Sequence, residues 1–154
     1  MIKLNLFCDK AIEENRVDVF YSEMNPIIQR IVDAANSEQP VLKSRDEEDI
    51  KYIDIKDIFY LDCVDKKVFA YTETHVYPLE ETLVHYEDVL ADYGFVRISK
   101  SNIVNIFKIK AIKSEINMRI GATFANGEKL YINRNYKKSF IDFLTRMRGC
   151  IDER

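Results

Sequence analysis

From Phe95 to Lys108 the chain reads FVRISKSNIVNIFK, and from Gly127 to Tyr136 it reads GEKLYINRNY. Short runs of apolar, β-branched residues alternate there with small polar and cationic residues. The β-branched runs favour strands, and the polar residues fall at the joints where those strands would end. A rigid β frame that carries Lys, Arg, Ser and Asn in its loops can hold an anionic polymer. Nucleic acid is therefore the first partner to test for this chain.

The charges divide the chain into two unequal parts. Residues 95–154 hold 13 Lys and Arg against 5 Asp and Glu, a net charge of +8, whereas residues 1–94 carry a net charge of −11. Such asymmetry, hidden within an overall charge of −3, indicates that the basic part contacts nucleic acid or a membrane surface.

Length and composition are those of a globular protein. The 154 residues are 47% hydrophobic and 32% charged, which suits one domain with a small appended element. The longest apolar runs are too short to span a bilayer, and residues 1–6 lack the apolar block of a signal peptide. We therefore expect a cytoplasmic protein.

Three widely spaced cysteines without a Cys-x-x-Cys pair indicate neither a zinc site nor a disulfide framework.

The hydrophobic pattern predicts a mainly β protein with three helices. Asn25 and Pro26 form an N-cap and a first helical residue, and Gly94 closes the second helix. Asn126-Gly127 predicts a hairpin in which both residues take positive φ. The expected helices are 26–36, 82–91 and 136–147. The expected strands are 2–6, 17–21, 50–55, 58–61, 68–71, 74–77, 95–98, 109–112, 118–124 and 129–132.

The part from about Ile50 to Leu144 resembles the LytTR DNA-binding domain of bacterial transcription regulators. The motifs that carry this resemblance are DIFYLD at 57–62, FVRISKSNIVN at 95–105 and GEKLYINRNY at 127–136, in this order. The resemblance implies an α+β fold of elongated, mostly antiparallel sheets with an inserted helix and a C-terminal helix. We expect this domain at 46–150. Residues 1–45 would form a strand–strand–helix element that serves dimerisation or regulation.

Members of the family read bases from three joints, and the resemblance places these joints at Lys66 or Lys67, at Lys100 and at Arg134. Arg can donate two parallel hydrogen bonds to guanine, and Lys can reach the same edge as a point donor. The resemblance therefore implies sequence-specific binding to double-stranded DNA, with loops in the major groove. Further polar residues at these joints suit phosphate oxygens; they are Ser99, Ser101, Asn133, Asn135 and Lys137.

Other residues near the joints have a second interpretation. Arg97 and Asn105 match the family motif, yet hydrogen bonds that stabilise the joints explain them at least as well. Four further lysines either add to the positive field or are solvated; they are Lys108, Lys110, Lys113 and Lys138.

The family also suggests partners. Many relatives carry a phosphorylatable receiver of roughly 120 residues. Only 49 residues precede Ile50, so we expect a regulator without a receiver domain. We expect a homodimer on repeated half-sites. Small relatives of this kind often work beside a membrane protein that restrains them, which makes such a protein a second expected partner.

Two other classes of function compete with this interpretation. An enzyme is disfavoured, because the four glycines are scattered and no GxSxG, HExxH or paired Cys–His arrangement is present. We accordingly expect no catalytic residue, cofactor, metal or small-molecule substrate. The alternative is a protein-interaction or RNA-binding module on the same scaffold. Binding to single strands usually needs exposed aromatic side chains, and most of the Tyr and Phe residues here fall at core-like positions.

Overall fold

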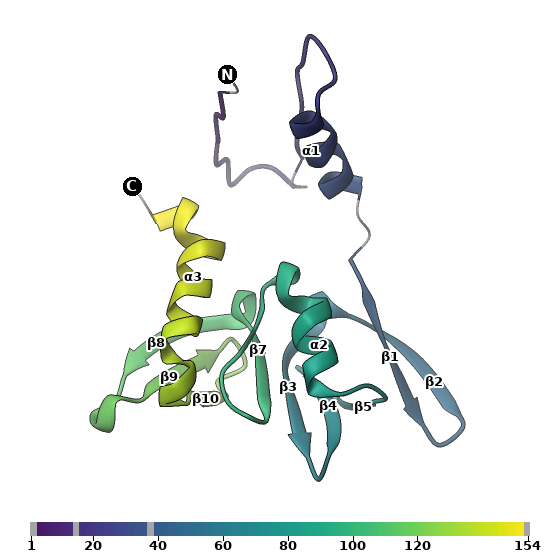
Figure 1. Ribbon diagram of the computed structural model, residues 1–154, viewed down its shortest axis with the longest axis vertical. Coiled ribbons are helices and arrows are strands. Elements are labelled where there is room, and N and C mark those ends of the chain that lie inside the picture. The colour runs from purple at the N-terminus through teal and green to yellow at the C-terminus, as the bar shows by residue number, and fades with distance from the viewer. Residues whose placement is uncertain (1–2, 14–15, 37–38, 153–154) are drawn as a thin grey trace. The chain divides into compact units, whose positions relative to one another are not determined.

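The computed structural model describes residues 3–13, 16–36 and 39–152. The chain divides into two compact units, Met1–Glu38 and Gln39–Arg154. The ribbon in Figure 1 shows the helix of the first unit and, in the second, two sheets with two further helices.

The described residues of the first unit form one regular element, the helix α1 (Pro26–Asn36). The Asn25 side-chain oxygen accepts hydrogen bonds from the backbone N–H groups of Ile27 (3.0 Å) and Ile28 (3.1 Å). The predicted N-cap is thereby confirmed. The strands predicted at 2–6 and 17–21 are wrong, because residues 3–13 and 16–25 form no strand; residues 1–2 lie outside the described part. A lone two-stranded hairpin is at best marginally stable in water, and Phe20 in this segment is 93% exposed.

A seven-stranded antiparallel sheet dominates the second unit. Its spatial order is β2-β1-β5-β4-β3-β7-β6. The strands are β1 (Val41–Asp46), β2 (Asp49–Asp54), β3 (Ile58–Val64), β4 (Lys67–Thr72), β5 (Val76–Leu79), β6 (Phe95–Arg97) and β7 (Asn102–Asn105). The inserted helix α2 (Leu83–Leu90) precedes β6, and its N-cap Thr82 accepts from the His85 N–H.

A smaller sheet and the C-terminal helix complete this unit. The sheet has the order β10-β9-β8, with β8 (Ile109–Ser114), β9 (Ile120–Phe124) and β10 (Lys129–Ile132). Helix α3 (Lys137–Asp152) follows β10. The expected α+β fold of antiparallel sheets with an inserted and a C-terminal helix is thus confirmed. Two strands of this unit, β1 and β7, were not predicted from the sequence.

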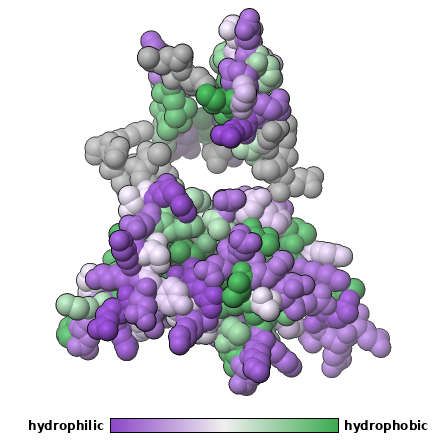
Figure 2. Space-filling model, viewed as in Figure 1, coloured by the Kyte–Doolittle hydropathy of each residue, from purple (hydrophilic) through white to green (hydrophobic). Residues whose placement is uncertain are grey.

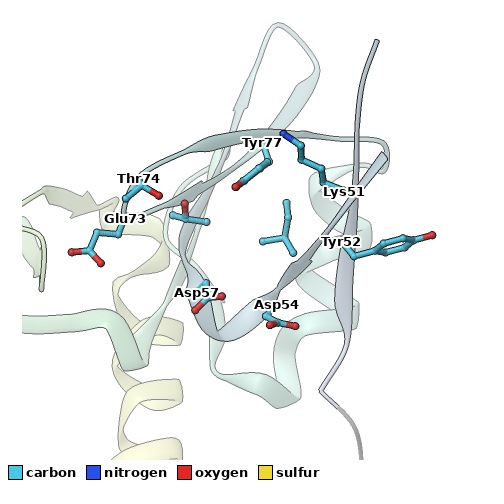
Figure 3. A pocket seen from close by; sticks show the side chains of 9 residues that line it. Lys51, Tyr52, Asp54, Asp57, Glu73, Thr74 and Tyr77 are labelled. Carbon is cyan, nitrogen blue, oxygen red and sulfur yellow. The ribbon is translucent and has the colours of Figure 1, made fainter. Parts of the chain in front are cut away.

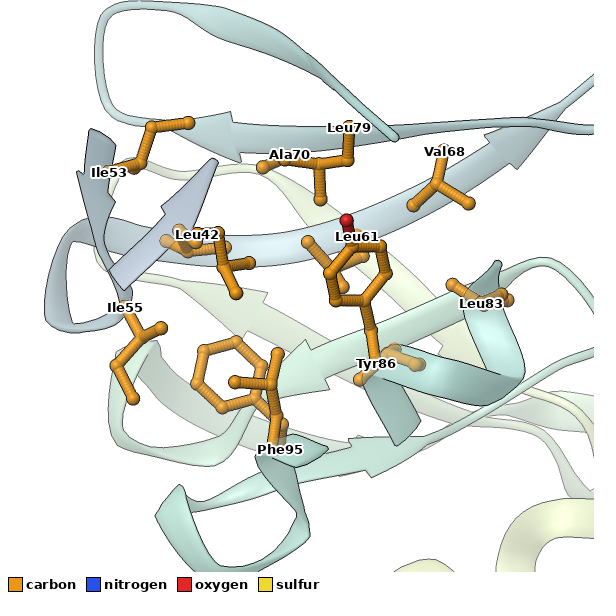
Figure 4. Packing of buried hydrophobic residues seen from close by; sticks show 13 residues of the cluster. Leu42, Ile53, Ile55, Leu61, Val68, Ala70, Leu79, Leu83, Tyr86 and Phe95 are labelled. Atoms are coloured by element: carbon orange, nitrogen blue, oxygen red, sulfur yellow. The ribbon is translucent and has the colours of Figure 1, made fainter. Parts of the chain in front are cut away.

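Two hydrophobic clusters lie on either side of the central strand β3. One packs helix α2 against the large sheet through Leu61, Tyr86 and Phe95, among others (Figure 4). The other joins the large sheet to the small sheet and to α3, with Phe124 and Phe140 fully buried. Successive residues of a strand point to opposite faces, so β3 can serve both clusters. The register shift in β3 between Ile58 and Tyr60 lets the consecutive residues Phe59 and Tyr60 both join the second cluster.

An aromatic group links the two sheets within the second cluster. The Tyr60 ring stacks on Tyr71 with centroids 4.4 Å apart, and it lies 5.7 Å from the Phe124 ring on β9. Burial, assisted by the nearby Glu128 carboxylate, raises the pKa of the Tyr60 hydroxyl. Tyr60 is therefore neutral at physiological pH, and it adds no negative charge to the loops at the end of its strand.

The hairpin turn at Asn126-Gly127 has a backbone conformation that differs from the prediction. A hairpin does form at Asn126-Gly127, but only Gly127 takes a positive φ (+89°). Its N–H bonds to the Phe124 carbonyl, the pattern of a type I turn followed by a left-handed glycine. Two consecutive positive φ values occur instead at Asp65–Lys66 (49° and 65°), where two residues join β3 to β4, and at Asn117–Met118 (74° and 62°), between β8 and β9.

A glycine fixes the entry to β6. Gly94 has φ +88°, and a Cβ atom there would lie 2.3 Å from Cε2 of the Phe107 ring. Its carbonyl accepts the Ile106 N–H at 2.9 Å. The position therefore requires glycine both for its backbone conformation and for the space around it.

We predict that Gly94→Ala lowers the free energy of unfolding more than Gly127→Ala does. Both glycines have a positive φ, but nothing lies within 4 Å of a Cβ at Gly127. Gly127→Ala should therefore cost only the backbone strain, about 1 kcal/mol. Adding Phe107→Ala to Gly94→Ala should remove the steric part, because the Phe107 side chain is 57% exposed. Urea unfolding measures the free energy of unfolding of the parent, the two glycine variants and the double variant. Equal losses at the two glycines would contradict the steric explanation.

Candidate nucleic-acid interface

The loop Ser99–Ser101, between β6 and β7, is stabilised by the hydroxyl group of Ser99. The Ser99 Oγ accepts the backbone N–H groups of Ser101 (3.2 Å) and Asn102 (3.0 Å). The Ile98 N–H closes the loop by donating to the Asn102 carbonyl at 3.0 Å. Lys100 is exposed at the loop's tip. The serine hydroxyls thus shape the loop, while the lysine is presented to solvent.

Arg97 fixes the same loop from the side. Its Nε donates to the Ser99 carbonyl (3.0 Å) and its Nη2 to the Lys100 carbonyl (2.6 Å). Its Nη1 binds the Glu87 carboxylate of α2 at 2.8 Å. The Arg97 side chain is only 17% exposed. A planar guanidinium can serve all three acceptors at once, so Arg97 positions the loop rather than facing a ligand.

A second set of bonds ties this loop to β3. The Ser101 carbonyl accepts the Cys63 N–H at 2.8 Å. The Asn102 Nδ2 donates to the Asp62 carboxylate at 3.0 Å, and its Oδ1 accepts from the two serine hydroxyls. The hairpin that continues β3 has Lys66 in its tight turn and Lys67 as the first residue of β4, both exposed.

The third joint follows β10. The Asn133 N–H donates to the Ile98 carbonyl at 2.8 Å, which attaches this joint to the residue just before the Ser99–Ser101 loop. The Asn133 side-chain oxygen caps the 3₁₀ turn Arg134–Tyr136 by accepting the Asn135 N–H. Lys137 then begins α3. Arg134, Asn135 and Lys137 are all exposed.

These bonds bring the three predicted joints together. Lys100 is two residues from Ile98, and Arg134 is one residue from Asn133. Extended residues span at most about 3.6 Å each, and Cα atoms of a hydrogen-bonded pair lie about 5.5 Å apart. The Cα atoms of Lys100 and Arg134 therefore lie within about 17 Å of each other. Lys66 is three residues from Cys63, which is bonded to the same loop.

Some residues of this arrangement were not assigned a role from the sequence. For Asn105 the sequence left a motif role and a joint-stabilising role open; its side chain donates to the Ile58 carbonyl at 2.9 Å and is buried. Asn102 stands in the family motif, and its side chain links the serine loop to β3. Glu87 gives no signal in the sequence, because its partner Arg97 lies ten residues away in another element.

A hollow beside β2 in the second unit is unsuited to an anion. It is about 540 Å³ in volume and open to solvent, and its lining includes Asp54, Asp57 and Glu73 (Figure 3). Three carboxylates against the single cation Lys51 would repel a phosphate group. In the view of Figure 2, hydrophilic side chains cover most of residues 39–152, with small hydrophobic patches between them.

Two other kinds of site were sought within residues 3–13, 16–36 and 39–152. No group of three or more His, Cys, Asp or Glu side chains in that part could hold a metal ion. No helix in it combines the length and apolar character needed to cross a membrane.

Comparisons with known proteins agree with the motifs. Residues 48–145 match the model of the LytTr DNA-binding domain. Uncharacterised HTH-type transcriptional regulators of Staphylococcus aureus are similar over 147 residues, which is 94% of this chain and 99% of theirs. Identity is 31% for the protein of strain MSSA476 and 30% for that of strain MRSA252.

A solved structure shares the fold. It is the LytTr DNA-binding domain of a protein described as a methyl-accepting/DNA response regulator from Bacillus cereus. The two chains superpose with a TM-score of 0.65 at 24% identity, over 70% of this chain and 98% of the other. The family match covers the three joints and the frame that holds them. The chain thus belongs to the LytTr DNA-binding domain family, and the function that this family implies is that of a DNA-binding transcription regulator, not of an enzyme.

Proposed function

We propose that this regulator binds double-stranded DNA in a sequence-specific manner and inserts its three joints into the major groove. The observation that carries the proposal is the set of backbone hydrogen bonds from Cys63 to Ser101 and from Asn133 to Ile98. They attach three loops with exposed cationic side chains to one frame. The major groove exposes a donor and acceptor pattern that differs for each base pair, and exposed Lys and Arg side chains on such loops can read it.

The order of the elements also favours reading by loops. Five strands separate α1 from α2, and five separate α2 from α3, so no two described α-helices follow one another. A helix-turn-helix needs two such consecutive helices, the second of which enters the groove. The exposed ends of strands are the remaining candidates for contact with bases.

We assign base reading to Lys66 or Lys67, to Lys100 and to Arg134, because these side chains are exposed at the tips or ends of the joints. Asn133, Asn135 and Lys137 are assigned to phosphate oxygens, which fix the register on the duplex. Ser99 and Ser101 are also assigned to phosphate contacts, because their hydroxyls shape the loop that would meet the DNA backbone. Exposed donors can change partners at little cost on binding, since they exchange water for DNA.

We also propose a homodimer in the cytoplasm, in which the N-terminal part expected at 1–45 serves dimerisation or regulation through its separate unit, Met1–Glu38, since residues from Val41 onward belong to β1 of the large sheet. In support, the described segment 3–25 exposes large apolar side chains, among them Phe7 (88%) and Phe20 (93%). Such side chains commonly mark an interaction surface. The same surface suits a membrane protein that restrains the regulator.

A competition experiment separates this function from the alternative of an RNA-binding or protein-interaction module. The parent protein selects its preferred duplex from a pool of random DNA sequences at fixed salt. The selected duplex then competes against its two single strands and against the matching RNA. We expect only the duplex DNA to displace labelled DNA at equal concentration. Displacement by single strands would favour the alternative.

We predict that Arg134→Ala weakens binding to the selected duplex by about 1–3 kcal/mol and relaxes the preference at one base pair, because a bidentate base contact is lost. Lys137→Ala is the matched control, with the same charge removed three residues away. It should weaken selected and scrambled duplexes alike and lower the slope of log K against log salt by about one. Fluorescence anisotropy at several salt concentrations measures both. An Arg134→Ala protein that retains the parent's base preference would contradict the assignment.

We predict that Arg97→Lys reduces sequence preference although the charge is kept. A lysine cannot serve Glu87 and both loop carbonyls together, so the loop that carries Lys100 should lose its fixed position. The expected loss on the selected duplex is about 1–2 kcal/mol, comparable to one or two hydrogen bonds. Because the net charge is unchanged, the salt slope should stay as in the parent. Glu87→Gln, which keeps an acceptor, should have a smaller effect. Unchanged preference in Arg97→Lys would exclude this positioning role.

A further inference from the structure

Two long strands of the second unit have one unpaired edge each. Within residues 3–13, 16–36 and 39–152, β2 pairs only with β1, at one end of the large sheet, and β8 pairs only with β9, at one end of the small sheet. Each strand has six residues. Figure 1 shows β2 and β8 at opposite ends of this unit, with β3, β4 and β7 between them. Exposed edges of this length are templates for pairing with another chain.

The two edges carry opposite charge. Residues 46–57, which include β2, hold six acidic side chains against two basic ones, a net charge of −4. Residues 108–119, which include β8, hold four basic side chains against one acidic one, a net charge of +3. The salt bridges found in the described part of the chain use none of the six acids, nor any of the four bases.

Apolar side chains are exposed beside these charges. Tyr52 on β2 is 69% exposed and points away from the neighbouring hollow in Figure 3. Ile112 on β8 is partly exposed, and Ile116 and Met118 in the turn after β8 are 88% and 73% exposed. The hollow beside β2 is lined by Asp54, Asp57 and Glu73, which suits a cationic side chain arriving from another surface.

We propose that the β2 edge of one copy pairs with the β8 edge of a second copy. Two β2 edges would bring acid against acid, and two β8 edges would bring base against base, so the charges disfavour pairing of like edges. The unlike edges attract each other, and main-chain hydrogen bonds can extend one sheet into the next. The partner is therefore a second copy of this chain. The two copies bind through different surfaces, the β2 edge of one and the β8 edge of the other.

This contact is heterologous, which decides the geometry of the assembly. Because the two surfaces lie at opposite ends of the unit, a bound pair still has one free β2 edge and one free β8 edge, and it can add further copies. All copies then point in the same direction. On DNA, such an arrangement fits half-sites that are directly repeated rather than inverted.

The test uses charge reversal on the full chain without DNA, so it is independent of the proposed DNA contacts. One variant carries Asp49→Lys and Asp54→Lys on β2, and the other carries Lys110→Glu and Lys113→Glu on β8. Sedimentation equilibrium measures the mean mass from micromolar to millimolar concentration, at low and at high salt. The control is Asp88→Lys with Asp92→Lys, which reverses two exposed charges near α2. Circular dichroism verifies that each variant is folded.

The parent and the control should increase in mean mass with concentration at low salt, beyond the mass of the homodimer proposed above, because the edge contact adds further copies to it. The increase should be smaller at high salt. Each edge variant alone should have lost this association, because its two edge strands then have the same sign. Counted within the strands, β2 and β8 carry +3 and +2 in the first variant and −1 and −2 in the second. An equimolar mixture of the two variants should recover it, since the edges of the two proteins are again complementary. A parent that stays monomeric or stops at a dimer, edge variants that associate like the parent, or a mixture without recovery would each overturn the proposal.

Discussion

The hydrogen bond from the Asn133 N–H to the Ile98 carbonyl is the constraint on which the interface depends. It joins the end of the last strand to the residue that precedes the serine loop, across 35 positions of sequence. Ile98 is 1% exposed, and its side chain lies in the same buried cluster as Ile132. Because a buried backbone carbonyl is costly to leave without a donor, burial of Ile98 and attachment of the third joint depend on each other.

The polar side chains at the joints form two groups with different roles: one stabilises the loops, and the other is available to contact DNA. Arg97, Asn102 and Asn105 are wholly or partly buried, and they bind carbonyl or carboxylate groups within the protein. Lys66, Lys100 and Arg134 are exposed on the backbone that those bonds hold. Side chains that must meet DNA can then remain hydrated and charged until binding, while the loops that carry them are already ordered. Ordering a loop in advance lowers the entropic cost of association.

Much of this fold follows from local patterns in the sequence. Asn25 and Pro26 mark the start of α1, and β-branched runs mark most strands of the second unit, because both signals act over a few neighbouring residues. The strands expected at 2–6 and 17–21 failed because alternation alone cannot supply a partner sheet. β1 was missed because its six residues include three charged ones; pairing with β2 and β5 decides its conformation. The bonds of Glu87 and Asn133 join distant segments, so one sequence could not reveal them.

The central claim is that the three joints meet one duplex together. Backbone amide NMR signals of the full chain, recorded while the selected duplex is added, test it most directly. The account predicts that the signals of Lys66, Lys67, Ser99 to Ser101 and Asn133 to Lys137 shift in parallel with a single affinity, while those of the exposed face of α2 change little. Large shifts confined to α2 or to β2, with the three joints unchanged, would contradict it.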